Sequence, residues 1–172
     1  EIREELAEKL ANFTGAPIDA DRELILTPGT QGALFLAAGT CIHRDDKVAI
    51  VEPDYFANRK LVKFFGGQLV PVSMDYLETD QGAGINLERL EGCFRSGVKV
   101  FIFSNPNNPT GVVYSPAEVT AIALLAQKYN VFVIVDQLYS RQIFEGCEYT
   151  HLRALNLMPS ENLLTIIGPS KT

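Results

Sequence analysis

Apolar and polar residues alternate along this chain with two periods, one typical of helices and one typical of strands. In the first segment, Ile2, Leu6, Leu10 and Phe13 recur at steps of three and four residues with charged residues between them, and Gly15 follows. This spacing places the apolar side chains on one face. Residues 1–13 are therefore expected to form an amphipathic helix that ends at the glycine.

Short apolar runs then alternate with segments of helical spacing up to the end of the chain. Strands are predicted at 24–26, 47–51, 68–72, 98–103, 131–135 and 163–167, and helices at 31–42, 55–65, 87–94 and 116–128. The last helix has the clearest start, because Ser115-Pro116-Ala117-Glu118 is a capping box with proline at the first helical position. Residues 75–85 are expected to form a polar loop and residues 137–160 an irregular stretch. The alternation predicts one α/β layer structure with a mostly parallel sheet and no internal domain boundary.

Composition narrows the classes of function. With 47% hydrophobic and 21% charged residues, the 172-residue chain has the composition of a folded domain. A net charge of −6 and a pI near 4.9 argue against nucleic acid as a partner. The cysteines Cys41, Cys93 and Cys147 are widely spaced, and only His43 and His151 could join them as ligands, so we expect neither a disulfide framework nor a metal site.

Targeting signals are not evident in the sequence. No run approaches the roughly 20 apolar residues that span a bilayer. The sequence opens with Glu1-Ile2-Arg3-Glu4-Glu5 and not with a basic segment followed by an apolar one. We therefore expect a cytoplasmic protein that does not bind membranes.

Gly29-Thr30-Gln31 is a candidate phosphate site, because it lies where a predicted strand turns into a helix. Free backbone N–H groups and the positive end of the helix dipole favour an anion there, and the Thr30 hydroxyl adds a donor. Such a turn is also common as a purely structural feature. The segment is neither a GxGxxG fingerprint nor a P-loop.

Asp136, Tyr139 and Asn108 follow predicted strands and could meet at one edge of the sheet. A carboxylate at the end of an apolar strand needs a partner, which a helix cap, an ion pair or a protonated pyridine nitrogen would provide. Asn108 and Tyr139 could donate hydrogen bonds to a phenolate oxygen on the same ring. Lys171 follows the last predicted strand and could enter the same cleft, although a lysine so placed is often merely solvated.

Together these segments resemble the large domain of the class I and II aminotransferases, the fold-type I pyridoxal-phosphate enzymes related to aspartate aminotransferase. The matching stretches are Gly29-Thr30-Gln31, Pro53-Asp54-Tyr55, Asn105-Pro106-Asn107-Asn108-Pro109-Thr110-Gly111, Asp136-Gln137-Leu138-Tyr139 and Ser170-Lys171-Thr172. The resemblance implies a three-layer αβα sandwich with a mostly parallel, mixed sheet.

The resemblance also implies a role for each candidate residue. Lys171 would form the Schiff base with pyridoxal 5'-phosphate, and Asp136 would pair with the pyridine nitrogen. Asn108 and Tyr139 would contact the ring hydroxyl, and Tyr55 would stack on the ring. Gly29, Thr30 and Gln31 would hold the phosphate, with Ser170 as a further contact.

The chain also departs from the family pattern. The family often has a phosphate-binding serine three residues before the lysine, where this chain has Gly168. We expect residues 1–172 to be a partial cofactor-binding domain that lacks the small C-terminal domain and the N-terminal arm. In the family, one more strand, antiparallel to the others, lies between the first strand and the strand leading to the lysine. Residues 24–26 and 163–167 would then flank an unfilled position.

The expected activity is transfer of an amino group between an L-amino acid and a 2-oxo acid, in a complete protein that is a homodimer. The 172 residues alone are expected to be inactive. Two alternatives stay open. The first is another fold-type I enzyme, such as a lyase, a decarboxylase or a cyclopropane-forming synthase, which would share the lysine and Asp136. The second is a non-catalytic fragment that acts as an assembly partner.

Overall fold

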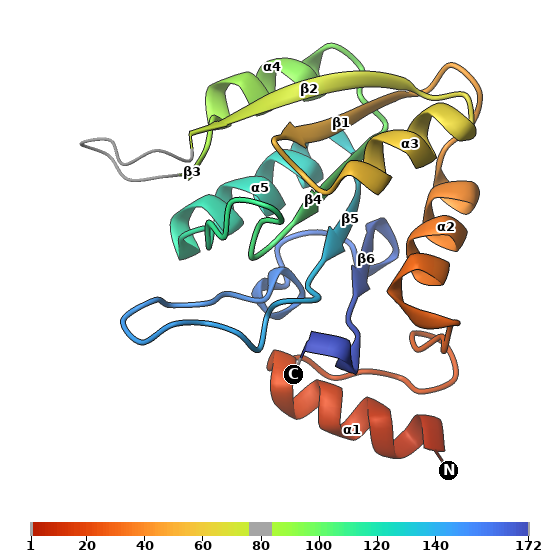
Figure 1. The fold of residues 1–172 in the computed structure, drawn as a ribbon, viewed down its shortest axis with the longest axis vertical. Helices are drawn as coiled ribbons and strands as arrows, with labels where there is room; N and C mark the ends of the chain where they lie inside the picture. Colours follow the sequence, from red (N-terminus) through yellow and green to blue (C-terminus); the bar gives the residue numbers. More distant parts are fainter. Residues whose placement is uncertain (1, 76–83, 172) are drawn as a thin grey trace.

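The strands of this protein form one sheet with helices on both faces (Figure 1). The computed structural model describes residues 2–75 and 84–171. The strands are β1 (Lys47–Glu52), β2 (Gln68–Asp75), β3 (Gly84–Ile85), β4 (Val100–Ser104), β5 (Phe132–Asp136) and β6 (Leu163–Ile166). The helices are α1 (Ile2–Thr14), α2 (Gly29–Cys41), α3 (Phe56–Phe64), α4 (Leu87–Arg95) and α5 (Pro116–Tyr129), with short 3-10 turns η1 (Leu152–Leu155), η2 (Ser160–Asn162) and η3 (Pro169–Lys171).

The strand order is β3-β2-β1-β4-β5-β6, and every pairing is parallel except the antiparallel pair of β2 and β3. From β1 the chain moves outward through α3 to β2, and it then returns through α4 to β4 on the other side of β1. The direction of winding therefore reverses between β1 and β4. In open α/β sheets such a switch point is where ligands bind, outside the carboxyl ends of the strands.

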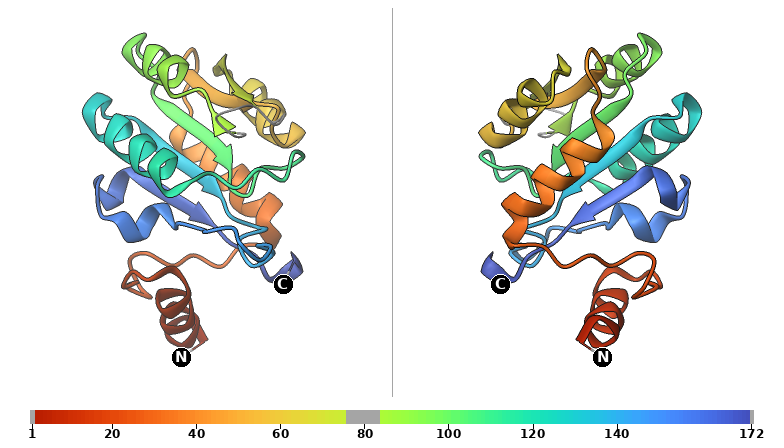
Figure 2. Two further views of the ribbon diagram at one scale, coloured as in Figure 1. Left: turned by 90° about the vertical axis from the view of Figure 1, so that its left-hand side faces the viewer. Right: turned by 90° about the vertical axis from the view of Figure 1, so that its right-hand side faces the viewer.

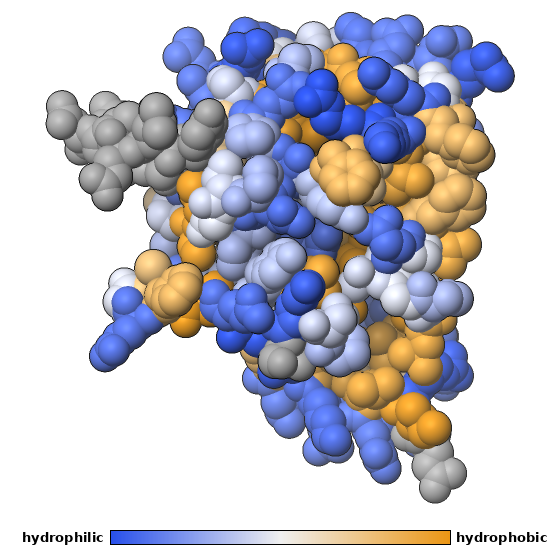
Figure 3. Space-filling view, in the orientation of Figure 1, coloured by the Kyte–Doolittle hydropathy of each residue, from blue (hydrophilic) through white to orange (hydrophobic). Residues whose placement is uncertain are grey.

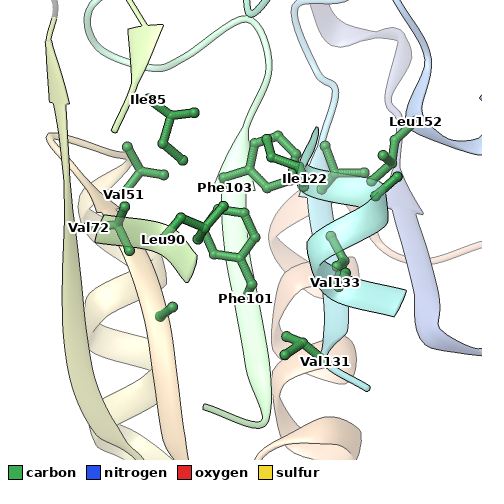
Figure 4. Close-up of a cluster of buried hydrophobic side chains, with 14 of the residues drawn as sticks. Val51, Val72, Ile85, Leu90, Phe101, Phe103, Ile122, Val131, Val133 and Leu152 are labelled. Carbon is green, nitrogen blue, oxygen red and sulfur yellow. The ribbon is translucent and has the colours of Figure 1, made fainter. Parts of the chain in front are cut away.

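Each strand of the parallel sheet contributes alternate side chains to two apolar cores, since successive residues point to opposite faces. One core packs Leu90 of α4 and Ile122 of α5 against Phe101 and Phe103 of β4 (Figure 4). The other packs Leu34 of α2 and residues of α3 against the opposite face. The predicted three-layer sandwich is therefore confirmed, and α1 lies to one side of it (Figure 2).

Helix α5 confirms the helix start predicted from its capping box. The Ser115 hydroxyl accepts a hydrogen bond from the Glu118 amide at 3.3 Å, and the Glu118 carboxylate accepts one from the Ser115 amide at 2.8 Å. Glu118 also accepts a hydrogen bond from the Ile85 amide at 2.8 Å, which ties β3 to this helix. At the end of α1, Gly15 has a φ of +75°, a conformation that glycine adopts at little cost.

Two predictions were wrong. Residues 24–26 do not form a strand, and Ile25 and Leu26 are 79% and 56% exposed. The reason is that a strand needs a hydrogen-bonding neighbour, and no strand in the described part of the chain pairs with this segment. In the predicted polar loop, Asp75 belongs to β2 and Gly84–Ile85 pairs with it as β3, while residues 76–83 lie outside the described residues.

The helices of the described ranges are all too short or too polar to cross a membrane. The same ranges contain no cluster of three or more histidine, cysteine, aspartate or glutamate residues that could hold a metal ion. The remaining predicted elements are present, with ends within two residues of the predicted ones except for the longer β2.

Candidate active site

Most of the predicted site residues follow or end strands whose carboxyl ends share one edge of the sheet. Tyr55 follows β1, Asn108 follows β4, Asp136 ends β5 and Lys171 follows β6, and these four strands are parallel. The first turn of α2, which contains Thr30, lies at the same edge, because Thr30 packs beside Gly168 in the chain after β6. The structure therefore brings the predicted segments to the edge where the sheet has its switch point.

Asp136 is a buried carboxyl group, 7% exposed, at the end of an apolar strand. Its Oδ1 accepts a hydrogen bond from the Leu138 amide at 3.0 Å, and its backbone carbonyl accepts one from the Asn105 amide at 2.9 Å. Burial raises the pKa of the carboxyl group, and the Leu138 amide offsets part of that rise. A cationic N–H group beside Asp136 would favour the charged form of the carboxyl group. A protonated pyridine nitrogen is such a group.

The loop after β4 shows which of its three asparagines is available to a ligand. Asn105 and Asn107 are buried and their side chains are hydrogen-bonded within the protein: Asn105 accepts from the Tyr114 amide, and Asn107 accepts from the amide and hydroxyl of Thr110 and donates to the Pro53 carbonyl. Asn108 is half-buried, and its backbone amide donates to Ser104 at 3.0 Å. Within the described ranges its side-chain amide has no hydrogen-bond partner, so it is free to contact a ring.

Gln31 and Tyr55 connect the start of α2 with the start of α3. The Gln31 side-chain amide donates a hydrogen bond to the Tyr55 hydroxyl at 2.8 Å. Pro28 precedes α2 and provides no side-chain cap, so the first backbone amides of this helix are not satisfied by a capping side chain. Such a helix start fits an anion, which is the ligand expected for Gly29, Thr30 and Gln31.

Gly168 explains how the chain after β6 passes the start of α2. A Cβ atom at Gly168 would lie 2.6 Å from Thr30 Cγ2, which side chains do not tolerate, and 3.2 Å from Leu138 Cδ1, which is tight. The Thr30 side chain therefore occupies the space that a serine at position 168 would need.

Lys171 and Ser170 are exposed in η3, and Tyr139 is half-buried in the turn after β5. Among the described residues, no hydrogen bond joins these side chains to another predicted site residue. The structure places them at the expected edge without assembling them around a common point.

Three further side chains line this part of the molecule and were not predicted. Asp54 and Ser104 are buried and hydrogen-bonded to each other at 2.5 Å. The Tyr149 hydroxyl donates to the Asn105 carbonyl at 2.8 Å, and burial followed by the nearby charge of Asp136 raises its pKa. The only signal in the sequence was the position of Asp54 beside Tyr55. Tyr149 gave none, because it comes from the irregular segment after β5.

Two hollows in the surface of the described residues lie away from the predicted site. A hollow of about 250 Å³ lies between residues 15–17 and η1, and a second one lies near Lys99 and Phe132 at the amino ends of the strands. Neither is lined by the residues predicted to bind a cofactor. The donor set fits pyridoxal phosphate on chemical grounds, because a buried carboxyl group, an unpaired amide and an uncapped helix start meet at one edge.

Comparisons with known proteins agree with this chemistry. An aspartate aminotransferase from Sulfolobus acidocaldarius is 34% identical over 146 residues, which is 83% of this chain and 36% of that protein. The crystal structure of an aspartate aminotransferase from Rhodobacter sphaeroides is 60% identical and superposes with a TM-score of 0.96, covering 99% of this chain and 43% of that one. A pyridoxal-phosphate-bound putative aminotransferase from Clostridium difficile is 26% identical, with a TM-score of 0.85 over 99% of this chain and 43% of its own.

The chain spans about two fifths of the length of these relatives. The family model for aminotransferases of class I and II matches residues 1–172, the whole sequence. This chain therefore belongs to the class I and II aminotransferase family.

Proposed function

We propose that the complete protein is a pyridoxal-phosphate-dependent aminotransferase and that these 172 residues form part of its cofactor-binding domain. The observation that carries the proposal is the buried Asp136 carboxyl group at the carboxyl end of β5, next to the switch point of the sheet. Burial without a cationic partner is unfavourable for a carboxylate. A protonated pyridine nitrogen supplies such a partner and explains why the group is there.

Each residue has a defined task in this proposal. Bound pyridoxal phosphate supplies an electron sink that stabilises negative charge at the substrate's α-carbon. Asp136 would keep the ring nitrogen protonated, and Asn108 and Tyr139 would hold the ring oxygen by hydrogen bonds. Tyr55, which accepts a hydrogen bond from Gln31, would contact the ring, and Gly29 and Thr30 would hold the phosphate with the α2 amides, with Ser170 as a further contact.

Lys171 would have two tasks. Its amine would hold the cofactor in the resting enzyme. Once freed by the amino group of a substrate, the amine would act as the base that removes the proton from the substrate's α-carbon and then as the acid that gives the proton back. Water would release the 2-oxo acid, and a second 2-oxo acid would take up the amino group in the reverse direction.

Acidic amino acids are the first substrates to test, because the Rhodobacter sphaeroides protein, 60% identical, is an aspartate aminotransferase. The complete protein should be mixed with L-aspartate without a 2-oxo acid. Formation of pyridoxamine phosphate in a single turnover is expected, and 2-oxoglutarate should reverse it. Release of ammonia or carbon dioxide instead would indicate a lyase or a decarboxylase on the same scaffold.

Lys171→Ala is the matched variant. Borohydride reduction should attach the cofactor to the wild-type protein at Lys171, and a peptide map by mass spectrometry should find no adduct in the variant. Lys47→Ala is the control, since Lys47 lies at the opposite edge of the sheet, where it donates to the Ser96 carbonyl. An adduct on another lysine would contradict the assignment of Lys171.

We also propose that the complete protein is a cytoplasmic homodimer. Support for a dimer comes from exposed apolar side chains on α2 and α3, namely Phe35, Leu36 and Phe64, which form part of an apolar surface (Figure 3). Sedimentation equilibrium of the complete protein should give twice the chain mass. A monomer at micromolar concentration would contradict this proposal.

A further inference from the structure

Asp54 is a second carboxyl group buried beside the site, and the chemistry proposed for the cofactor does not use it. Its side chain follows β1 and is 9% exposed. Oδ1 accepts two hydrogen bonds, from the Tyr55 amide at 2.6 Å and from the Ser104 hydroxyl at 2.5 Å. Oδ2 is fully buried and has no partner within the described ranges. A carboxyl group held in this way is a specific feature, because burying one without full compensation is costly.

Ser104 extends these hydrogen bonds to the next loop. Its hydroxyl donates to Asp54 and accepts a hydrogen bond from the Asn108 amide at 3.0 Å. A continuous path therefore runs from the Tyr55 amide through Asp54 and Ser104 to the Asn108 amide. Tyr55 and Asn108 are the two residues proposed to contact the ring from its face and its edge.

The path crosses the switch point of the sheet. Asp54 follows β1 and Ser104 ends β4, and these neighbouring strands are those between which the winding reverses. A second hydrogen bond joins the same two loops, from the Asn107 side chain to the Pro53 carbonyl at 3.1 Å. The backbone pairing of β1 and β4 ends at Ile50 and Ile102, so beyond that point these polar contacts join the two loops at the ligand edge.

The groups described around Asp54 are hydrogen-bond donors and no cation, which suits a structural hydrogen bond and not an ion pair. Burial raises the pKa of Asp54 to about 7, the hydrogen bonds from Ser104 and Tyr55 lower it, and the charge of Asp136 raises it. The Tyr114 hydroxyl is also buried near Asp54, and it brings no positive charge. In either charge state Oδ1 can accept these two hydrogen bonds, so this role of Asp54 does not require a negative charge.

We propose that Asp54 is a positioning residue: through Tyr55 on one side and Ser104 on the other, it holds Tyr55 and Asn108 at the separation that the cofactor ring requires. The inference rests on the proposed function, because it gives Tyr55 and Asn108 their roles at the ring. It assigns no chemical step to Asp54 itself. Its distinctive consequence is that an amide, which retains the acceptor oxygen, should replace the carboxyl group.

The test compares Asp54→Ala with Asp54→Asn in the complete protein. Asp54→Ala should weaken equilibrium binding of pyridoxal phosphate about tenfold or more, since two hydrogen bonds are lost in a buried site. Asp54→Asn should bind within about threefold of wild type and restore the visible circular dichroism of the bound cofactor. Asp46→Ala is the control, because Asp46 also accepts a backbone hydrogen bond, from His43, but lies at the amino ends of the strands.

Hydrogen exchange in the protein without cofactor provides a reading that does not depend on binding. Asp54→Ala should speed exchange of both the Tyr55 and the Asn108 amides. Ser104→Ala should speed exchange at Asn108 and leave Tyr55 protected, because it cuts the path at one side only. Ser104→Ala also keeps the inference testable if Asp54→Ala does not fold.

The outcomes separate the two proposals. A wild-type protein that neither binds pyridoxal phosphate nor yields a borohydride adduct at Lys171 would overturn the proposed function. Normal cofactor binding by wild type together with unchanged binding and exchange in Asp54→Ala would overturn the role of Asp54 alone. Asp54→Asn that binds as weakly as Asp54→Ala would also overturn it, because the charge and not the acceptor would then matter.

Discussion

The two halves of the ligand edge are built differently. On the side of β1, β4 and β5, Asp54, Ser104 and Asp136 are buried and joined to backbone amides by short hydrogen bonds. On the side of α2 and β6, Ser170 and Lys171 are exposed, and the neighbouring segment 24–26 has exposed apolar side chains. The first half is preorganised by hydrogen bonds within the described residues, whereas the same residues provide no such hydrogen bonds to the Ser170 and Lys171 side chains.

Asp136→Asn tests the preorganised half and should have the largest effect. The amide fills the same space and should still allow the cofactor to bind, but it cannot keep the ring nitrogen protonated. If the carboxylate contributes about 4 kcal/mol to stabilising the carbanion, the single-turnover rate with an amino acid should fall about a thousandfold. Rapid-mixing absorbance measurements of the complete protein would show this. A rate near that of wild type would mean that Asp136 is only structural.

Gly168→Ser tests the exposed half and should have an intermediate effect. The new Cβ would lie 2.6 Å from Thr30 Cγ2, so the start of α2 must shift. Cofactor affinity is expected to fall about tenfold. This change corresponds to the loss of roughly one charge-assisted hydrogen bond to the phosphate. Fluorescence titration with pyridoxal phosphate gives the dissociation constant.

Two further variants sharpen this measurement. Adding Thr30→Ala should recover part of the affinity of Gly168→Ser, because the clash is then relieved, and the two effects should not be additive. Gly92→Ser in α4 is the control, because a Cβ at Gly92 meets no atom within 4 Å. Additive losses from Thr30→Ala and Gly168→Ser would show that the two residues do not share this space.

The smallest expected effect concerns stability and pH in the buried half. Burial raises the pKa of Asp54 to about 7, and burial with the charge of Arg141 lowers the pKa of His151 to about 4. Between about pH 4 and 6.5, folding therefore takes up a proton at Asp54 and releases one at His151. The Asp54 contribution to stability is lost as the pH rises towards 7, and the His151 contribution is lost as the pH falls towards 4. The two dependences oppose each other in the wild-type protein.

Substituting one of these two residues should leave the pH dependence of stability that the other one causes. The free energy of unfolding of Asp54→Asn relative to wild type should rise with pH from about 4 to 7, by at most about 1.4 kcal/mol per pH unit. The free energy of unfolding of His151→Asn relative to wild type should fall as the pH rises from about 4 to 6.5. Denaturant titrations of the complete protein at several pH values would measure both. A difference for Asp54→Asn that does not vary with pH would mean that this carboxyl group titrates normally in the folded state.

The sequence was most informative where a local pattern determines the structure. The capping box at Ser115 set the start of α5, and the apolar run before Asp136 placed that carboxyl group at a strand end. Residues 24–26 were misread because an apolar triplet becomes a strand only when another strand pairs with it, and that partner is not a local property. Asp54 was passed over for a similar reason, since its partner Ser104 lies 50 residues away.

The unpaired side of β6 has a consequence for how this protein is made. In the described part of the chain β6 is an edge strand, so its outward N–H and C=O groups are available to the further antiparallel strand that is expected beside it. All pairings that build the centre of the sheet join strands distant in sequence, so the sheet forms slowly compared with local helices. Until that further strand is in place during folding, the edge of β6 could pair with extended segments of other copies. Yield during expression should depend on temperature and synthesis rate more than on the stability of the finished fold.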